Sequence, residues 1–135
     1  MAESKEFKIL NGQLSITALL KAYHSFEEII GEPENPIVRD ASIQRFEYCL
    51  ELAWKTLKKI LKIKSGADIY YPNDVFREAA KGGLIQNTEL WITFLEKRNL
   101  TSHTYNEATA VEVYEILPEF SIELKKLVDT LKNLK

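Results

Sequence analysis

The 135-residue sequence has little cysteine and glycine, and it lacks any long apolar run. The single cysteine, Cys49, excludes an internal disulfide. The glycine pair Gly82-Gly83 lacks the following lysine and hydroxyl residue of a phosphate-binding loop. No apolar stretch approaches the roughly 20 residues that span a bilayer. Because the first eight residues, MAESKEFK, also lack an apolar signal core, we expect a cytoplasmic protein without membrane association.

The chain also lacks an excess of positive charge. Its net charge is −2 and its isoelectric point is about 5.8, so it differs from nucleic-acid binders that rely on overall basic character. Any contact with RNA must therefore be local. Hydrophobic residues make up 45% and charged residues 28%, which is typical of a globular protein. The length predicts one domain over residues 1–135.

What the sequence does have is helical spacing, with apolar residues every three or four positions along nearly the whole chain. The first helix is expected to end at Gly31, and Asn11-Gly12 leaves its start open. Asn35 is expected to cap a second, long helix that begins at Pro36 and runs to about Lys64. Gly66 lies just past its end, where a left-handed residue is favoured.

Three further helices are predicted in the second half. Asn73 is expected to cap a short helix, and Asn87 or Thr88 a longer one. Pro118 should kink or divide the last helix, because proline removes a backbone donor. No segment alternates regularly between apolar and polar residues. The predicted fold is therefore all-α: an antiparallel up-down bundle of four main helices plus a short one.

The segment from Trp91 to Tyr105, WITFLEKRNLTSHTY, carries the most chemistry. It places Arg98 five positions and Asn99 four positions before His103, with Tyr105 two positions after it. A guanidinium binds phosphate through two parallel hydrogen bonds, and an imidazole titrates near neutral pH. If the helix ends near Thr101, His103 can turn back toward Arg98. We interpret the group as a candidate phosphodiester site.

The other readings of these residues are structural. A histidine or arginine at a helix end can simply complement the helix dipole, and Tyr105 can be a half-buried packing residue. His24 has no neighbour at metal-ligand spacing, so we predict no metal site there. Cys49 lies in the most apolar part of the second helix and is expected to be an inert, buried thiol.

The densest basic stretch lies in the second helix, in which Glu47, Glu51, Lys55 and Lys59 recur every four residues. We interpret it as a solvated face of ion pairs. The alternative is a patch beside the Arg98 and His103 site that attracts phosphate groups. Its members are Lys55, Lys58, Lys59 and Lys62.

On two stretches the sequence resembles the HEPN superfamily, and more closely its branch of nucleotidyltransferase substrate-binding proteins. One is RFEYCLELAWKTLKKIL, Arg45 to Leu61, and the other is the W-x6-RN-x3-H-x-Y pattern from Trp91 to Tyr105. The second matches that family's R-x4-H-x-Y signature at every defined position. With a similar helix order, the resemblance covers about the whole chain.

The resemblance implies a helical bundle that forms a homodimer, with two copies of the signature near the two-fold axis. It implies a metal-independent ribonuclease toxin without a cofactor, encoded beside a minimal nucleotidyltransferase that acts as antitoxin. His103 would then be the base, Arg98 would stabilise the phosphoryl charge, and Asn99 would position one of these two groups. Tyr105 would bind the substrate phosphate or receive AMP from the partner. The product would carry a 2′,3′-cyclic phosphate.

Two alternatives remain open from the sequence. In the first, the chain is a noncatalytic subunit that presents a substrate or nucleotide to a nucleotidyltransferase. In the second, it is a dimeric scaffold whose signature has lost its activity. Retained Arg98, Asn99, His103 and Tyr105 favour the ribonuclease, whereas the negative net charge favours a narrow substrate range or weak RNA affinity.

Overall fold

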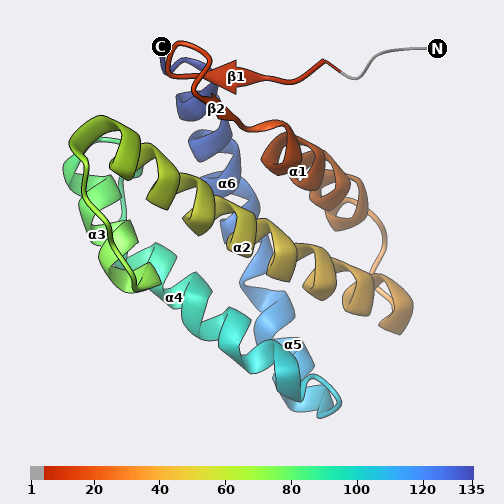
Figure 1. Cartoon of the computed structure of the whole chain (residues 1–135). Helices are drawn as coiled ribbons and strands as arrows, with labels where there is room; N and C mark the ends of the chain where they lie inside the picture. The colour runs from red at the N-terminus through yellow and green to blue at the C-terminus, as the bar shows by residue number, and fades with distance from the viewer. Residues whose placement is uncertain (1–4) are drawn as a thin grey trace.

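The computed structural model describes residues 5–135, which form a helical bundle with one small hairpin (Figure 1). The first four residues, which contributed to the expectation of no export signal, lie outside this range. The elements are β1 (Lys8–Ile9), β2 (Leu14–Ser15), α1 (Thr17–Ile30), α2 (Pro36–Ser65), α3 (Pro72–Lys81), α4 (Thr88–Asn99), the 3-10 helix η1 (Leu100–His103), α5 (Glu107–Glu115) and α6 (Leu117–Lys132).

The bundle has the predicted up-down arrangement. Figure 1 shows α1 and α4 running in one direction, and α2 and the α5–α6 pair running back. Helix α2 is the longest element and packs against every other helix of the bundle. The junction of α4, η1 and α5 lies at the N-terminal end of α2, whereas α3 lies at its C-terminal end. The all-α prediction is confirmed.

The predicted ends of α2 are confirmed by their capping geometry. The Asn35 side chain accepts a hydrogen bond of 2.9 Å from the Val38 amide, and Pro36 occupies the first helical position. At the other end Gly66 has φ +74° and donates its amide hydrogen to the Lys62 carbonyl. The Asn35 side chain thus determines the start of the longest helix, and the left-handed backbone of Gly66 determines its end.

The expected cap of α3 is wrong. Asn73 lies inside the first turn, because the helix already begins at Pro72 with Tyr71 in the extended capping position. Proline has a fixed φ and needs no helical amide partner, so it starts this helix two residues earlier than a cap at Asn73 would. For α4 the structure decides between the two candidates: the Asn87 side chain accepts from the Leu90 amide at 3.0 Å.

Two other boundaries refine the predictions. Before α1 the chain forms the hairpin β1–β2, in which Asn11 and Gly12 take left-handed conformations in the turn. Each strand has two residues, too few to show a period of two in the sequence. The last main helix is divided, as predicted: α5 ends at Glu115, and Pro118 lies in the first turn of α6.

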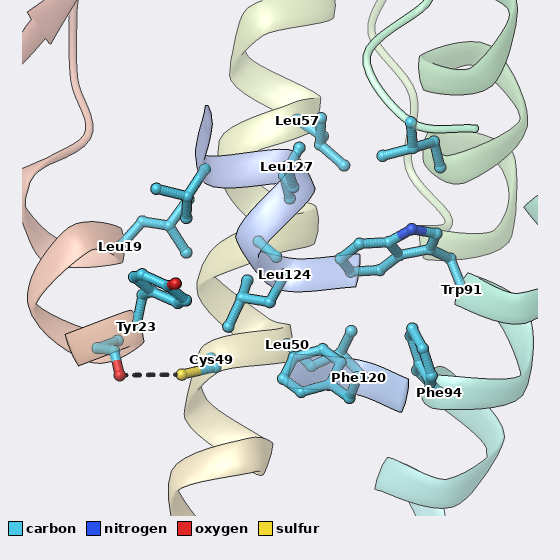
Figure 2. Packing of buried hydrophobic residues seen from close by; sticks show 14 of the residues in the cluster. Leu19, Tyr23, Cys49, Leu50, Leu57, Trp91, Phe94, Phe120, Leu124 and Leu127 are labelled. Atoms are coloured by element: carbon cyan, nitrogen blue, oxygen red, sulfur yellow. Dashed lines mark hydrogen bonds between the residues drawn. The ribbon is translucent and has the colours of Figure 1, made fainter. Parts of the chain in front are cut away.

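The core is a single cluster of apolar side chains contributed by all six helices of the described part of the chain. At its centre the Phe120 ring lies edge-on to Phe26, Phe46 and Phe94, with ring centroids 4.8 to 5.4 Å apart. Trp91 also lies edge-on to Phe120 and is 1% exposed. Figure 2 shows Trp91, Phe94 and Phe120 near Leu50 of α2 and Leu124 of α6. Edge-to-face contacts of this kind stabilise the core beyond simple burial.

The single thiol is part of this core. Cys49 is fully buried, and its Sγ lies 3.2 Å from the Ala22 carbonyl oxygen of α1 (Figure 2). Burial raises the pKa of this thiol to about 12, because an apolar environment disfavours the thiolate. The prediction of a buried thiol is confirmed, and its lack of reactivity stays a prediction. None of the helices in residues 5–135 combines the length and apolarity of a bilayer-crossing segment.

Candidate functional site at the end of helix α4

The signature segment lies where α4 changes into a 3-10 helix. Helix α4 ends at Asn99, and η1 continues from Leu100 to His103. The Thr101 hydroxyl donates to the Arg98 carbonyl oxygen at 2.6 Å, and the Thr104 hydroxyl donates to the Thr101 carbonyl oxygen at 3.1 Å. These bonds add side-chain donors to backbone carbonyls in the last turn of α4 and in η1. The helix end is therefore built by the threonines of the signature itself.

Arg98 faces α2, where it binds a carboxylate. Its Nη2 lies 2.8 Å from Oε1 of Glu51, and both side chains are about one-third exposed or less. The same Oε1 accepts a hydrogen bond of 3.3 Å from the Trp54 indole, and the Lys55 ammonium lies 3.2 Å from Oε2. A charge-assisted contact of this length fixes the direction of a guanidinium. Glu51 thus holds Arg98 at the boundary between α2 and α4.

The electrostatics around Glu51 favour its ionised form. Burial raises the pKa of its carboxyl, but the hydrogen bonds from Trp54 and Lys55 and the positive charges of Arg98 and Lys55 lower it. The net result is a pKa below the ordinary value of 4.5. At neutral pH the pair is therefore an ionised carboxylate and a guanidinium, with a second cation alongside.

His103 and Tyr105 lie together on the solvent side of the same corner. Their ring centroids are 6.1 Å apart with the planes 74° to each other. The Tyr105 side chain is 86% exposed, and His103 and Asn99 are exposed as well. The expectation that Tyr105 could be a half-buried packing residue is wrong. The structure brings the imidazole and the phenol together in the open.

Arg98 and His103 do not contact each other directly in residues 5–135. Arg98 is directed to Glu51, and His103 is directed to Tyr105. The sequence suggested that the chain could turn back after the end of α4. It does not, because η1 keeps the backbone helical as far as His103.

A polar groove adjoins this corner. It has a volume of about 260 Å³ and lies between α2 and the residues that follow Asn99. Thr101, Thr104 and Tyr105 form one wall. The opposite wall is one face of α2, with Asp40, Ile43, Gln44 and Glu47.

Sequence reasoning missed both Glu51 as the partner of Arg98 and the acidic wall of the groove. The available signal was the spacing of four polar positions, i, i+4, i+7 and i+11, which places them on one face of a helix. These positions are Asp40, Gln44, Glu47 and Glu51.

The predicted lysine patch continues the same face of α2 beyond Glu51. Lys55 takes part in the Arg98 network through Glu51, while Lys58 and Lys62 reach the linker that follows α2. The Lys62 ammonium lies 3.9 Å from the Asp68 carboxylate. The interpretation as a face of ion pairs is thus confirmed for Lys55 and Lys62. Whether the patch attracts phosphate remains a prediction.

Metal-binding groups are not assembled at this corner. Within residues 5–135 no group of three or more histidine, cysteine, aspartate or glutamate side chains is placed to hold an ion. The carboxylate nearest to the signature, Glu51, is already bound to two cations. His24 lies on the exposed side of α1 against Tyr23, at 5.4 Å between ring centroids. The chemistry available here is that of an imidazole, a guanidinium, an amide and a phenol.

The comparisons with known proteins agree on one family. The family model described as "Nucleotidyltransferase substrate binding protein like" matches residues 14–133. A protein of Haemophilus influenzae described as "Probable ribonuclease HepT" is 29% identical over 141 residues, covering 93% of this chain and 97% of its own. The family-model match extends over the hairpin's second strand and all the helices.

Solved structures give the same result. A Thermus thermophilus protein is 34% identical, with a TM-score of 0.78 over 84% of this chain and 98% of that one. A Haemophilus influenzae structure, described as showing the fold of a substrate binding domain of a nucleotidyltransferase, is 29% identical. It has a TM-score of 0.80 over 87% of this chain and 99% of that one. The chain belongs to the nucleotidyltransferase substrate-binding protein-like family, which has the HEPN-like helical fold.

Proposed function

We propose that the protein is a metal-independent endoribonuclease toxin of the HEPN type. The observation that carries this proposal is the exposed corner at the end of α4, where Arg98, Asn99 and His103 follow one another within a turn and a half. A relative described as a probable ribonuclease supports it over nearly the full length of both chains. The residues at the corner supply a base, a cation and a neutral hydrogen-bonding group, which RNA cleavage by its own 2′-hydroxyl requires.

In the proposed reaction the His103 imidazole accepts the proton of an RNA 2′-hydroxyl. The 2′-oxygen forms a bond to the adjacent phosphorus, and the bond from phosphorus to the 5′-oxygen breaks. The leaving oxygen takes up a proton, so the products are a 2′,3′-cyclic phosphate and a 5′-hydroxyl. Arg98 stabilises the charge on the phosphoryl oxygens, and the Asn99 amide orients the phosphate or the imidazole. Stabilisation by one such donor is typically about 3 kcal/mol in the transition state.

We further propose that two copies of the chain assemble at this corner. Tyr105 is 86% exposed and Ile37, at the nearby start of α2, is 81% exposed. Exposed large side chains of this kind favour a contact surface. A two-fold contact here would bring two signatures together and cover the open side of His103.

The proposed regulator is a minimal nucleotidyltransferase that acts as antitoxin. Such a partner is supported by the family model and by the Haemophilus influenzae structure, since the description of each refers to a nucleotidyltransferase. The Tyr105 hydroxyl is accessible to it. In the transfer, the phenol oxygen bonds to the α-phosphorus of ATP, and pyrophosphate leaves. The added AMP would place a negative charge beside His103 and oppose RNA binding.

The first prediction concerns the two central side chains. His103→Ala and Arg98→Ala should each lower RNA cleavage by about a hundredfold or more, because the base or the phosphoryl cation is lost. Cleavage of total RNA by the purified protein, with EDTA present and the ends of the products analysed, measures this. His24→Ala is the matched control, since His24 is an exposed histidine on α1, and it should cleave at the wild-type rate.

Circular dichroism should show that all three variants keep the helical fold. Cleavage by His103→Ala at the wild-type rate would contradict the assignment of the base. Loss of activity on adding EDTA would contradict a metal-independent reaction.

A noncatalytic role is the second candidate, favoured by the description of a substrate-binding domain for the Haemophilus influenzae structure. In that case the wild-type protein cleaves no RNA but binds the nucleotidyltransferase tightly. Altering the exposed face of α2 would then lower the activity of the partner. Cleavage assays and co-purification with the partner separate the two functions.

A further inference from the structure

A second surface lies on the C-terminal half of α2, beginning next to the Glu51 that binds Arg98. We propose that it binds the single-stranded RNA upstream or downstream of the cleaved bond. The inference rests on the proposed ribonuclease function and adds an RNA-binding site to it. The members of this lysine–tyrosine surface are Lys55, Lys58, Lys59 and Lys62 on α2, and Tyr70 and Tyr71 on the linker to α3.

The lysines form a stripe that starts at the Arg98 network. At 100° per residue, positions 55, 58, 59 and 62 occupy an arc of about 100° on the same side of the helix as Glu51. From Glu51 to Lys62 the stripe is about 16 Å long at 1.5 Å per residue. That length corresponds to about five phosphate spacings of a stacked strand. A strand cut beside Arg98 can therefore continue along the lysines.

The charge of this face changes sign at the signature. Before Glu51 the face carries Asp40, Gln44 and Glu47, which line the groove beside Tyr105. Carboxylates repel the phosphate groups of RNA, and lysines attract them. The lysine side of the face is thus the favourable direction for the strand, even though the whole chain carries a net charge of −2.

The two tyrosines belong to the linker that follows α2, and Tyr70 lies beside Lys58 in the middle of the lysine stripe. Tyr70 is 72% exposed and Tyr71 is 71% exposed, although both are large rings in adjacent positions. The Lys58 ammonium lies 5.4 Å from the centre of the Tyr70 ring, which is close enough for a cation–π contact. A ring held in this way loses little further freedom when a base stacks on it.

A groove of about 480 Å³ runs beside the two rings. The linker and one side of α3 line it, and Figure 1 shows the linker running alongside α3. Arg77 and Lys81 on α3 contribute cations, which are held by Asp74 and Glu78 at 2.9 and 3.1 Å. Exposed aromatic rings next to a basic stripe are the arrangement that binds single strands without reading their sequence.

The test uses a fluorescently labelled single-stranded DNA of mixed sequence, which lacks the 2′-hydroxyl and cannot be cleaved. Binding to the full-length protein is followed by fluorescence anisotropy at several salt concentrations. Tyr70→Ala and Tyr71→Ala should each weaken binding about fivefold or more, since base stacking is lost. Tyr70→Phe and Tyr71→Phe keep the rings and should bind like the wild type.

The lysines are tested by their salt dependence. Lys58→Gln combined with Lys62→Gln should lower the slope of log affinity against log salt by about 1.4, because each phosphate contact on a single strand contributes about 0.7. The matched control is Lys125→Gln with Lys126→Gln on α6, which removes the same number of positive charges from another surface. The control should leave the slope unchanged.

Wild-type affinity in both alanine variants would overturn this proposal. Alanine variants that bind DNA normally but no longer bind the nucleotidyltransferase or self-associate would also overturn it. The surface would then be a protein interface. The proposal is separable from the ribonuclease assignment. Binding that depends on Tyr70 and Tyr71 in a protein that cleaves no RNA supports the surface and rejects the nuclease. Cleavage that depends on His103, together with DNA binding that does not depend on the tyrosines, supports the nuclease and rejects the surface.

Discussion

At the scale of single residues, Glu51 is the partner that defines the position of Arg98. Its carboxylate receives the guanidinium at 2.8 Å, the Trp54 indole at 3.3 Å and the Lys55 ammonium at 3.2 Å. These contacts come from two helices, so they hold α4 to α2 as well as the side chain to its place. Removing the carboxylate should therefore lower the stability of the fold and release the Arg98 side chain from its position.

Glu51→Gln should lower the free energy of unfolding by about 1 kcal/mol at pH 7, the usual size for a partly buried, charge-assisted pair. Because the pKa of Glu51 is lowered in the folded protein, the stabilisation is complete above the ordinary value of 4.5 and is lost as the pH falls below it. Urea unfolding at pH 7 and pH 3 measures the difference between the wild type and the variant, which should be smaller at pH 3.

Glu28→Gln is the control for this measurement. Glu28 also faces an arginine, Arg45, but at 3.8 Å and with a side chain that is 79% exposed. Its loss should change the stability by less than about 0.5 kcal/mol at either pH. A pH-independent effect of Glu51→Gln would show that packing, and not charge, holds the pair.

The sequence was sufficient to identify the residues of the signature, but it was not sufficient to predict which side chains they contact. Arg98, Asn99, His103 and Tyr105 stand close together along the chain, and their chemistry indicates a phosphate site by itself. Glu51 lies on another helix, and which face of α2 meets the end of α4 depends on the packing of the whole bundle. The repeat of Glu51 and Lys55 was visible, yet it indicated only an ion pair within one helix.

At the scale of elements, the termini of α2 show how strongly single residues define a helix. Gly66 has φ +74°, and a β-carbon at this position would meet no atom within 4 Å. The cost of replacing it is therefore a cost of backbone conformation alone. Gly31, which follows α1, has φ −85° and equally free surroundings.

These two glycines give a matched pair of variants. Gly66→Ala should lower the free energy of unfolding by about 1 kcal/mol, because the left-handed conformation disfavours a side chain. Gly31→Ala should leave it unchanged or raise it by up to about 0.5 kcal/mol, since alanine restricts the unfolded chain. Thermal and urea unfolding followed by circular dichroism measures both. Equal effects of the two changes would rule out φ as the cause.

Element boundaries were predictable where a capping residue acts alone. Asn35, Asn87 and Gly66 were found in the sequence because each forms a local backbone contact. Asn73 was assigned wrongly because Pro72 competes for the same helix start. The hairpin could not be seen, because strands of two residues depend on the turn at Asn11-Gly12 and on the underlying core for their position.

At the scale of the whole molecule, the aromatic cluster joins the helices into one unit. Phe120 of α6 meets rings from α1, α2 and α4. Helical spacing predicted that the helices would form a bundle, but the apolar stripe expected after Pro118 began at Ile122, which is exposed, and left out Phe120. It could not show which rings would meet, because any pair of amphipathic helices can be rotated against each other until the complete core is formed.

Phe120→Ala should therefore destabilise the whole bundle, by about 3 to 5 kcal/mol, through lost burial and the cavity left behind. Ile122→Ala on the same helix is the control, because Ile122 is 58% exposed and should cost less than about 0.5 kcal/mol. Urea unfolding followed by both tryptophan fluorescence and circular dichroism should give one common transition. Loss of the Trp91 signal before the helical signal would mean that the aromatic cluster unfolds separately.

The buried thiol gives the molecule a practical property. Cys49 is the only cysteine of the sequence, and it lies out of reach of solvent with its pKa raised to about 12. Alkylating reagents attack the thiolate of accessible cysteines, so the folded wild-type chain should stay unlabelled. A cysteine introduced at an exposed position can then carry a spin label or dye at one defined place, without replacing the native residue. Distances between labels on two copies would report directly how the subunits are arranged.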